Sequence, residues 1–436
     1  MTAEGLSRLP SLLLWSRPMA PADRPLLRVD SLQLRNYRGF ESLDLELHPQ
    51  VTVLFGENGA GKTNVLAALA TLLAGLWQKA PRNIEPSDAY EPTVQPSLAR
   101  QGRYPVSLSA RVMLRGEAVA MGREVESLDS RTTNADVKAA RAVFAKVLQG
   151  ESEPWPLLAW YGTQRLHDRA RDSQRKRPKP GRREDGWVDC LDPRSSEEQL
   201  LQWWFEASLP MLQGAPSPAH DALVRVLRAA VAQPQPDGSV DEIDAVALEL
   251  PDGLPVFRFA SGRVVRWEHL SDGYHIFLGL VGDLARRAWT LNAGVIADPI
   301  ATVEGVVLID ELDLHLHPRW QMAVVEGLRR AFPRVQFVVT THSPLVLASV
   351  HNDQVRRLSA GRLVARDALV HGRDPNSIYE DQGVPLRQPW ARRHIAEIAE
   401  LIDADKRDEA LQMLRAMEEE WGTEDAALVR LRAWLG

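Results

Sequence analysis

Residues 51–63 read VTVLFGENGAGKT, and they contain the most specific pattern in the chain. Five residues typical of a buried strand run into a loop of the form G-x-x-x-x-G-K-[ST] at 56–63. Apolar side chains follow at the spacing of one helix face, at 65, 66, 69, 72, 73 and 76. Glycines let backbone N–H groups converge on phosphate oxygens, and a helix N-terminus adds a positive dipole end. The chain is therefore predicted to bind a nucleoside triphosphate.

The residues of this loop have different expected roles. Lys62 would bridge the β- and γ-phosphates, and Thr63 would offer its hydroxyl to Mg²⁺. The other residues would surround the phosphates, and they are Gly56, Glu57, Asn58, Gly59, Ala60 and Gly61, with Asn64 in the first helical turn. The predicted cofactors are ATP and Mg²⁺, and the sequence leaves GTP open as the nucleotide.

A second pattern places two acids at the end of a buried strand. Residues 306–309, VVLI, are continuously apolar and run into Asp310 and Glu311. A helical stretch follows, and then residues 335–339 form another apolar strand before a polar segment that contains His342. A right-handed crossover brings both strand ends to one edge of the sheet, where ligands bind. Asp310 would hold Mg²⁺ through water, Glu311 would polarise the attacking water, and His342 would reach the γ-phosphate.

Residues 270–275, LSDGYH, precede a helical run with apolar side chains at 276, 277, 280, 281 and 284. Ser271 suits the N-cap position of that helix. A second helix N-terminus therefore carries a serine and, with Gly273, a glycine at its tip. On its own, this pattern is that of an ordinary capped helix.

The composition is that of a globular protein. The chain has 436 residues with 44% hydrophobic and 25% charged residues, which excludes a collagen-like or wholly disordered chain and suits two to three domains. The formal net charge is −6, so any nucleic-acid contact needs a local basic patch. The single cysteine, Cys190, cannot form an internal disulfide, and the longest apolar stretch, 65–77, is too short to cross a bilayer. We expect a cytoplasmic protein with no membrane span.

We expect five consecutive segments. They are a loose leader at 1–26, a first lobe with the phosphate loop at 27–90, an insert at 91–265, a second lobe at 266–375 and a helical tail at 376–436. Within the insert, residues 165–185 are predicted to be a basic loop and 196–232 to be helical. The predicted fold class is α/β, a P-loop NTPase with an inserted helical and β lobe and a C-terminal helical tail.

Together, these motifs resemble the ABC-type ATPase heads of RecF, SMC and OLD proteins. Residues 34–40, LRNYRGF, are similar to the first strand of those heads, which implies that Arg38 approaches the nucleotide. Residues 160–165, WYGTQR, stand where those heads have a glutamine loop, which implies that Gln164 senses Mg²⁺ and water.

The same resemblance gives residues 270–274 a role. They look like the ABC signature, which normally reads LSGGQ, and they depart from it at Asp272 and Tyr274. In those proteins two heads close face to face around two nucleotides, which implies that Ser271 and Gly273 act in trans. The two departures leave the rate of turnover open.

A narrower resemblance is to PtuA, the ATPase of Septu antiphage systems and of related retrons. Four segments carry it, namely residues 279–288, 308–320 (LIDELDLHLHPRW), 337–344 and 371–374, and it covers most of residues 27–400. It implies a homodimer, or a higher oligomer of dimers, with two-fold isologous contacts. It also implies a separate HNH-type nuclease subunit, with DNA or another nucleic acid reached through the complex.

The chain itself is not expected to contain a nuclease centre. Only 94 residues follow His342, and their periodicity is helical rather than that of the acid-tipped strands of a Toprim nuclease, as in OLD proteins. From Ile395 onward they hold eleven acidic against five basic residues. Their apolar stripe either packs on its own domain or receives a partner, and it consists of Ile395, Ile398, Ile402, Leu411, Leu414 and Met417.

Two other functions compete with a regulatory ATPase of a defence complex. A RecF-like ATPase of DNA repair or recombination would bind DNA through residues 165–183, where nine Lys and Arg stand against two Asp. The motor of a membrane transporter would share the phosphate loop, but the sequence at 32–40 is of the RecF kind. Neutral substitutions in the basic segment test direct DNA binding, at Arg175, Lys176, Arg177, Arg182 and Arg183.

Overall fold

The computed structural model describes residues 24–77, 98–129, 140, 142, 144–145, 153–163, 182–193, 197–232, 243–249, 253–364 and 369–435. The chain divides into two compact units, residues 1–372 and 373–436. Most of the expected leader and most of the expected basic loop lie outside the described residues, which begin at 24 and omit 164–181.

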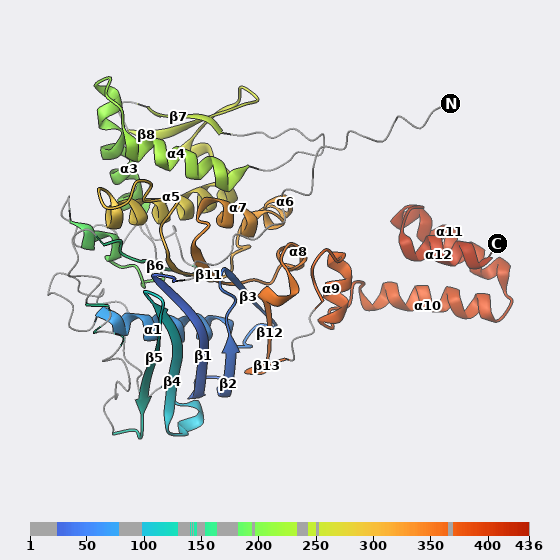
Figure 1. The fold of residues 1–436 in the computed structure, drawn as a ribbon. Helices are drawn as coiled ribbons and strands as arrows, with labels where there is room; N and C mark the ends of the chain where they lie inside the picture. The colour runs from blue at the N-terminus through green and yellow to red at the C-terminus, as the bar shows by residue number, and fades with distance from the viewer. Residues whose placement is uncertain are drawn as a thin grey trace, which may run out of the picture. The chain divides into compact units, whose positions relative to one another are not determined.

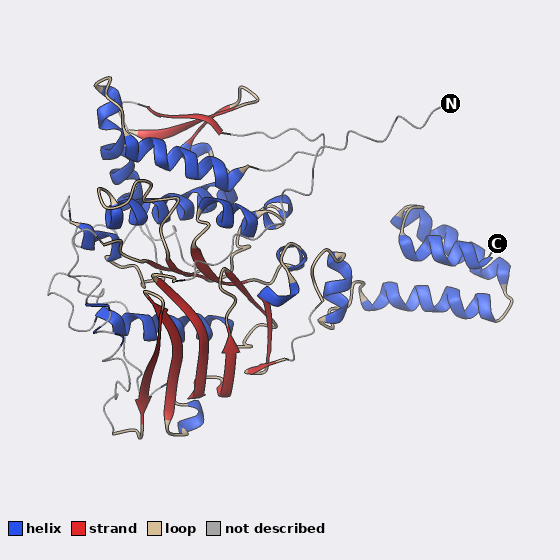
Figure 2. Cartoon of the chain, in the orientation of Figure 1, coloured by secondary structure: helices blue, strands red, loops and turns tan. Residues whose placement is uncertain are grey.

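The first unit contains a six-stranded sheet (Figures 1 and 2). Its strands are β3 (Val51–Phe55), β6 (Leu157–Tyr161), β10 (Gly305–Ile309), β11 (Val335–Thr340), β12 (Val355–Ser359) and β13 (Arg362–Leu363), in the order β13-β12-β3-β11-β10-β6. Five strands are parallel, and β13 is antiparallel to β12. All residues of β3, β6, β10 and β11 are buried, as expected of parallel strands covered on both faces. This order confirms the predicted β-α-β unit and places β11 between β3 and β10.

A four-stranded antiparallel sheet packs on the first helix, α1 (Lys62–Ala74). Its strands are β1 (Leu27–Tyr37), β2 (Phe40–Glu46), β4 (Val106–Leu114) and β5 (Glu117–Val125), in the order β2-β1-β4-β5. Helix α1 contacts both this sheet and strands β10 and β11 of the six-stranded sheet. We expected one apolar face on α1, but eleven of its thirteen residues are buried because sheets lie on both sides of it.

The residues expected to form one insert, 91–265, belong to three different parts of the first unit. Strands β4 and β5 extend the antiparallel sheet next to β1, and β6 forms the edge of the six-stranded sheet next to β10. The described elements from α3 to β9 form a helical and β lobe, which packs on α5 and α7. The pairing of β4 with β1 spans about 80 residues and has no local signal in the sequence.

This lobe contains α3 (Glu197–Leu212), α4 (Pro218–Val231) and a three-stranded sheet of β7 (Ile243–Glu249), β8 (Leu254–Phe259) and β9 (Val264–Arg266). Figure 1 shows α5 (Asp272–Asn292) and α7 (Val324–Ala331) between the six-stranded sheet and the pair α3 and α4. The shorter elements are α6 (Pro318–Gln321), α8 (Pro344–Ala348) and the 3₁₀ turns Gly75–Trp77, Arg100–Gly102, Arg183–Trp187, Trp267–His269 and Asn352–Gln354. Among the described residues, no helix is long and apolar enough to cross a membrane.

One member of the expected basic loop has a structural role. The guanidinium of Arg183 stacks on the ring of Trp155 at 4.0 Å and donates to the carbonyl oxygens of Leu291 and Glu153 at 2.6 and 2.8 Å. Arg183 begins the 3₁₀ turn Arg183–Trp187 rather than continuing a solvated loop. It is therefore a poor candidate for a DNA contact, and its substitution would disturb the fold.

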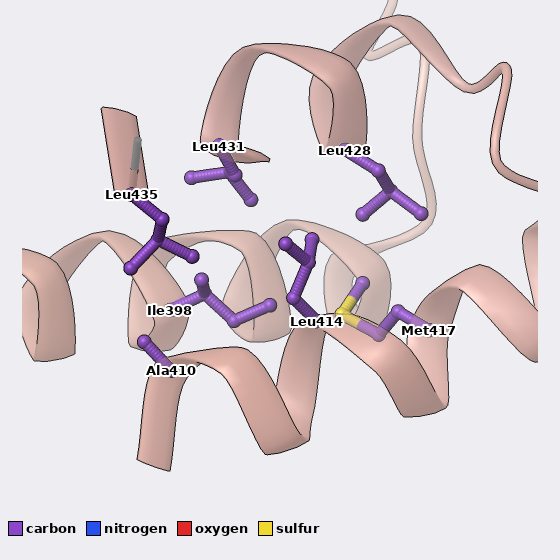
Figure 3. Close-up of a cluster of buried hydrophobic side chains, with 7 residues drawn as sticks. All are labelled: Ile398, Ala410, Leu414, Met417, Leu428, Leu431 and Leu435. Carbon is purple, nitrogen blue, oxygen red and sulfur yellow. The ribbon is translucent and has the colours of Figure 1, made fainter. Parts of the chain in front are cut away.

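The second unit is helical and has its own hydrophobic core (Figure 3). Its helices are α9 (Pro375–Asp381), α10 (Pro389–Asp403), α11 (Arg407–Trp421) and α12 (Ala426–Leu435). The core consists of Ile398, Ala410, Leu414, Met417, Leu428, Leu431 and Leu435, with Ile395, Ile402 and Leu411 partly buried against it. The apolar stripe seen in the sequence therefore packs within the unit, which is the first of the two interpretations given above.

Candidate nucleotide site

The loop after β3 has the backbone geometry that its glycines allow. Gly56, Gly59 and Gly61 have φ values of +146°, +81° and +103°, a region that favours glycine. A Cβ on Gly56 would lie 1.9 Å from the carbonyl oxygen of Leu358, and one on Gly61 would lie 2.4 Å from the ring of Phe40. The loop is therefore held between β12 and β2 in a shape that only glycine permits at these positions.

Lys62 lies inside this loop. Its ammonium group donates to the carbonyl oxygens of Gly56 and Glu57 at 2.9 and 3.0 Å. Burial lowers the pKa of Lys62, while the carboxylates of Asp310 and Glu311 oppose that shift. The arrangement places a cation at the mouth of a backbone loop, where it can meet phosphate oxygens.

Two distant segments meet at the carboxyl edge of the sheet. Thr63 donates from its hydroxyl to Oδ2 of Asp310 at 2.8 Å, across 247 positions of the chain. A hydroxyl and a carboxylate are hard oxygen ligands of the kind that Mg²⁺ prefers. The residues present therefore fit a nucleotide with its Mg²⁺, and they bring together the side chains that the sequence assigned to that task.

Thr340, at the end of β11, orients both acids. Its hydroxyl donates to Oδ1 of Asp310 at 2.7 Å and accepts from the backbone N–H of Glu311 at 2.7 Å. Asp310 is thereby fixed through both of its oxygens, and Glu311 follows with a positive φ of +47°. No role was predicted for Thr340 from the sequence, although a hydroxyl residue at the end of an apolar strand is a signal that could have found it.

The segment after β11 is anchored in a similar way. Thr341 donates to Oδ1 of Asp313 at 2.6 Å, and the backbone N–H of His342 lies 3.4 Å from the same oxygen. Thr341 and Asp313 were also missed as site residues. The side chain of His342 is exposed, at the same sheet edge as Asp310 and Glu311. The structure therefore brings the predicted His342 to the predicted edge.

Of the two residues that the resemblance places near the nucleotide, the structure describes Arg38 but not Gln164. Arg38, in the turn between β1 and β2, donates to Oδ1 of Asn64 on α1 at 2.7 Å, so it lies beside the first turn after the phosphate loop. Gln164 lies outside the described residues. The strand that leads toward it, β6, ends beside the acidic strand, because the N–H of Asp310 donates to the carbonyl oxygen of Tyr161 at 2.8 Å.

Ser271 occupies the N-cap position of α5, as predicted, but its side chain makes no capping hydrogen bond. Ser271 and Asp272 are exposed. A Cβ on Gly273 would lie 2.6 Å from the carbonyl oxygen of His315, so this glycine permits close packing of α5 on the segment after Glu311. Tyr274, one of the two departures from the signature, packs edge to face on Trp320 with ring centroids 4.5 Å apart.

Helix α5 also carries a buried ionic cluster beneath the sheet edge. Asp283 accepts from the hydroxyl of Tyr161 at 2.7 Å, from Nε of Arg287 at 2.8 Å and from Nε of Arg286 at 2.9 Å. Burial by itself would raise the pKa of Asp283, but the two guanidinium groups outweigh it and hold the pKa well below its usual range. The cluster ties α5 to β6, the neighbour of the acidic strand.

Comparisons with known proteins agree with this geometry. Residues 31–138 match the family described as "AAA domain", and residues 217–348 match the family described as "AAA domain, putative AbiEii toxin, Type IV TA system". The chain is 25% identical to the retron Vc95 probable ATPase of Vibrio cholerae serotype O1 biovar El Tor, over 76% of this chain and 73% of that one. It is 41% identical to the Septu protein PtuA of Bacillus mycoides strain KBAB4, over 20% of this chain and 12% of that one.

Among solved structures, one similar chain is the SMC head bound to the C-terminal winged-helix domain of ScpA. That similarity covers 77% of this chain and 97% of the SMC head, with 16% identity and a TM-score of 0.43.

The phosphate loop, the acidic strand end and the family matches define the class of this protein. Both matched families are described as AAA domains, so the chain is similar to AAA/ABC-type ATPases over residues 31–138 and 217–348. The curated relatives that it matches include retron ATPases and the Septu protein PtuA.

Proposed function

We propose that this protein binds and hydrolyses ATP, with Mg²⁺, as the regulatory subunit of a bacterial antiphage defence complex. The observation that carries the proposal is the hydrogen bond between Thr63 and Asp310, because it joins the phosphate loop to the acidic strand end beside Glu311. Similarity to retron and Septu ATPases supports the defence role.

In this proposal each residue of the chain has a limited task. Lys62 neutralises charge on the phosphates. The hydroxyl of Thr63 and, through water, the carboxylate of Asp310 would hold Mg²⁺, which would supply further positive charge to the phosphates. Glu311 orients and deprotonates the attacking water, and His342 donates a hydrogen bond to the γ-phosphate. Arg38 approaches the nucleotide from the β1–β2 turn. Gln164, which follows β6 in the sequence, senses Mg²⁺ and the attacking water.

We infer that two copies of this chain close head to head, with Ser271 and Gly273 of one copy completing the nucleotide site of the other. The exposed hydroxyl of Ser271 and the N-terminus of α5, a helix of 21 residues, support this role because together they offer donors to an anion. The state of the nucleotide would then control a separate HNH-type nuclease subunit, the partner that the resemblance to PtuA implies.

The test of the ATPase is Glu311→Gln, which keeps the size of the side chain and removes its basicity. We expect ATP to bind as in the wild type, turnover to fall at least about a hundredfold, as for loss of a general base, and ATP-bound dimers to accumulate. Size-exclusion chromatography with light scattering, together with a phosphate-release assay, measures these effects. Glu117→Gln, an exposed acid at the start of β5, is the matched control. Unaltered turnover in Glu311→Gln would contradict the proposed role.

A further inference from the structure

One carboxylate holds both ends of the segment that contains Ser271 and Gly273. Glu197, the first residue of α3, accepts through Oε1 from the indole N–H of Trp267 at 2.6 Å, and the same oxygen lies 2.8 Å from Nε2 of His275. The rings of Trp267 and His275 also meet edge to face, with centroids 4.7 Å apart. Because these two residues flank 268–274, Glu197 fixes where the segment starts and where its helix begins.

The carboxylate of Glu197 is shielded from water while the middle of the segment is not. Only 12% of the Glu197 side chain and 20% of the His275 side chain are exposed, and Trp267 is buried. Ser271 and Asp272, between the two anchors, are exposed. Loss of the carboxylate would leave polar N–H groups unpaired in a shielded place, which is unfavourable. The two anchors are therefore shielded and hydrogen-bonded, while Ser271 between them is exposed to solvent.

The same contact joins the segment to the core of the helical and β lobe. Trp267 packs against Trp204 on α3 and Phe257 on β8, with ring centroids 6.0 and 6.1 Å apart. A shift of α3 would therefore move Glu197 and Trp267 together. Through these contacts a change in the position of α3 would reach Ser271.

On its other side, the start of α5 is fixed against the segment after Glu311. Gly273 is packed so closely on the carbonyl oxygen of His315 that no Cβ fits, and Tyr274 packs on Trp320 of α6. Tyr274 also meets Phe259 of β8 edge to face. The signature segment therefore lies between the lobe and the end of the acidic strand of its own chain.

We propose that Glu197 is a positioning residue: without touching the nucleotide, it holds Ser271 and Gly273 in the geometry that completes the nucleotide site of a second copy of this chain. This inference rests on the head-to-head dimer proposed above. It adds a residue from the lobe, outside every nucleotide-binding motif, to the machinery of turnover.

The direct test compares Glu197→Ala with Glu197→Gln, each also combined with Glu311→Gln. We expect Glu197→Ala to leave ATP affinity of the isolated chain within about twofold. ATP-dependent dimer formation and kcat should each fall at least about tenfold, the size expected for lost hydrogen bonds to a charged group, with KM little changed. Glu197→Gln keeps an acceptor oxygen and should recover most of the loss. Glu198→Gln, an exposed neighbour in the same helical turn, should behave as the wild type.

Mixed dimers distinguish positioning in trans from a folding defect. Chains with Lys62→Ala cannot use their own phosphate loop but still supply an intact signature segment. Mixed with Glu197→Ala chains, they should restore turnover at one of the two sites, because the intact segment then faces an intact loop. Trp267→Phe, which removes one N–H and keeps the ring packing, is a milder variant and should give a smaller loss.

Four outcomes overturn the inference. If Glu197→Ala combined with Glu311→Gln forms ATP-dependent dimers as well as Glu311→Gln alone, Glu197 does not position the segment. The same conclusion follows if the mixed dimers recover no turnover. If ATP affinity falls as far as kcat in Glu197→Ala, the residue supports the fold in general. Where the parent Glu311→Gln itself forms no ATP-dependent dimer, the proposed head-to-head function fails first, and this inference fails with it.

Discussion

At the scale of the residue, the site depends on a threonine that no motif marks. Thr340→Val keeps the shape of the side chain and removes the hydroxyl that contacts Asp310 and the N–H of Glu311. We expect the affinity for ATP in the presence of Mg²⁺ to fall about 10- to 100-fold, the usual effect of losing a residue that orients a metal ligand. Isothermal titration calorimetry measures this loss.

The same titration without Mg²⁺ is the control. In EDTA the wild type and Thr340→Val should bind ATP with similar affinity. Thr340 acts through Asp310, and none of the described hydrogen bonds of its side chain reaches the phosphate loop. Thr340→Ser retains a hydroxyl and should stay close to the wild type. A loss of equal size with and without Mg²⁺ would contradict a role through the metal ligand.

A second residue, Asp283, stabilises the fold through buried ion pairs with Arg286 and Arg287. Asp283→Asn leaves Arg286 and Arg287 buried without a counter-charge, and we expect a loss of about 3–5 kcal/mol in the free energy of unfolding. Denaturant unfolding monitored by circular dichroism measures it. Asp298→Asn, which removes an exposed ion pair with Arg225, is the matched control and should cost less than about 1 kcal/mol.

The pH dependence of this effect has a fixed sign. The folded protein holds the pKa of Asp283 below the value of about 4 that it has in an unfolded chain. Its contribution to stability is therefore complete above about pH 4 and is lost as the pH falls below that value. The difference in stability between the wild type and Asp283→Asn should shrink in that acidic range, and a difference that grows there would contradict this account.

At the scale of the element, the sequence predicted those strands and helices whose own residues specify them. Strand β3 and its glycine loop, strand β10 with its two acids, and β11 with the segment after it all follow from local patterns. The contact between Thr63 and Asp310 could also be anticipated, since parallel strand ends share one edge of a sheet. What local pattern could not give is pairing across long distances in sequence, as between β1 and β4 or between β6 and β10.

The residues that the sequence analysis missed share this limit. Thr340 and Glu197 act through contacts with residues 30 and 78 positions away, and neither stands in a recognised motif. The apolar stripe of the tail had two interpretations from the sequence, packing within its own domain or binding a partner. Only the packing seen in the structure distinguishes them. Since Ile398, Leu414 and Met417 form the core of the second unit, a partner must use another surface of that unit.

The position of that core also determines how the tail should be removed. A deletion of residues 395–436 would remove this whole core and leave α9 and the start of α10 without the helices that they belong to. The boundary between the two compact units lies at residues 372 and 373. Removing residues 373–436 therefore takes away a whole packed unit, together with its exposed Trp390 and Trp434.

At the scale of the whole molecule, the proposal divides the labour between this ATPase and a separate nuclease. We expect an affinity-tagged chain, purified at low salt from a lysate of its native cells, to bring down a nuclease subunit in fixed stoichiometry, which mass spectrometry would identify. The chain without residues 373–436 should bind ATP as before and lose the nuclease, because the second unit is compact in itself and contains none of the nucleotide-site residues. If the chain without residues 373–436 still binds the nuclease, the docking surface lies on the first unit. Co-purification of DNA without a nuclease, lost at higher salt, would instead favour a RecF-like ATPase that binds DNA directly.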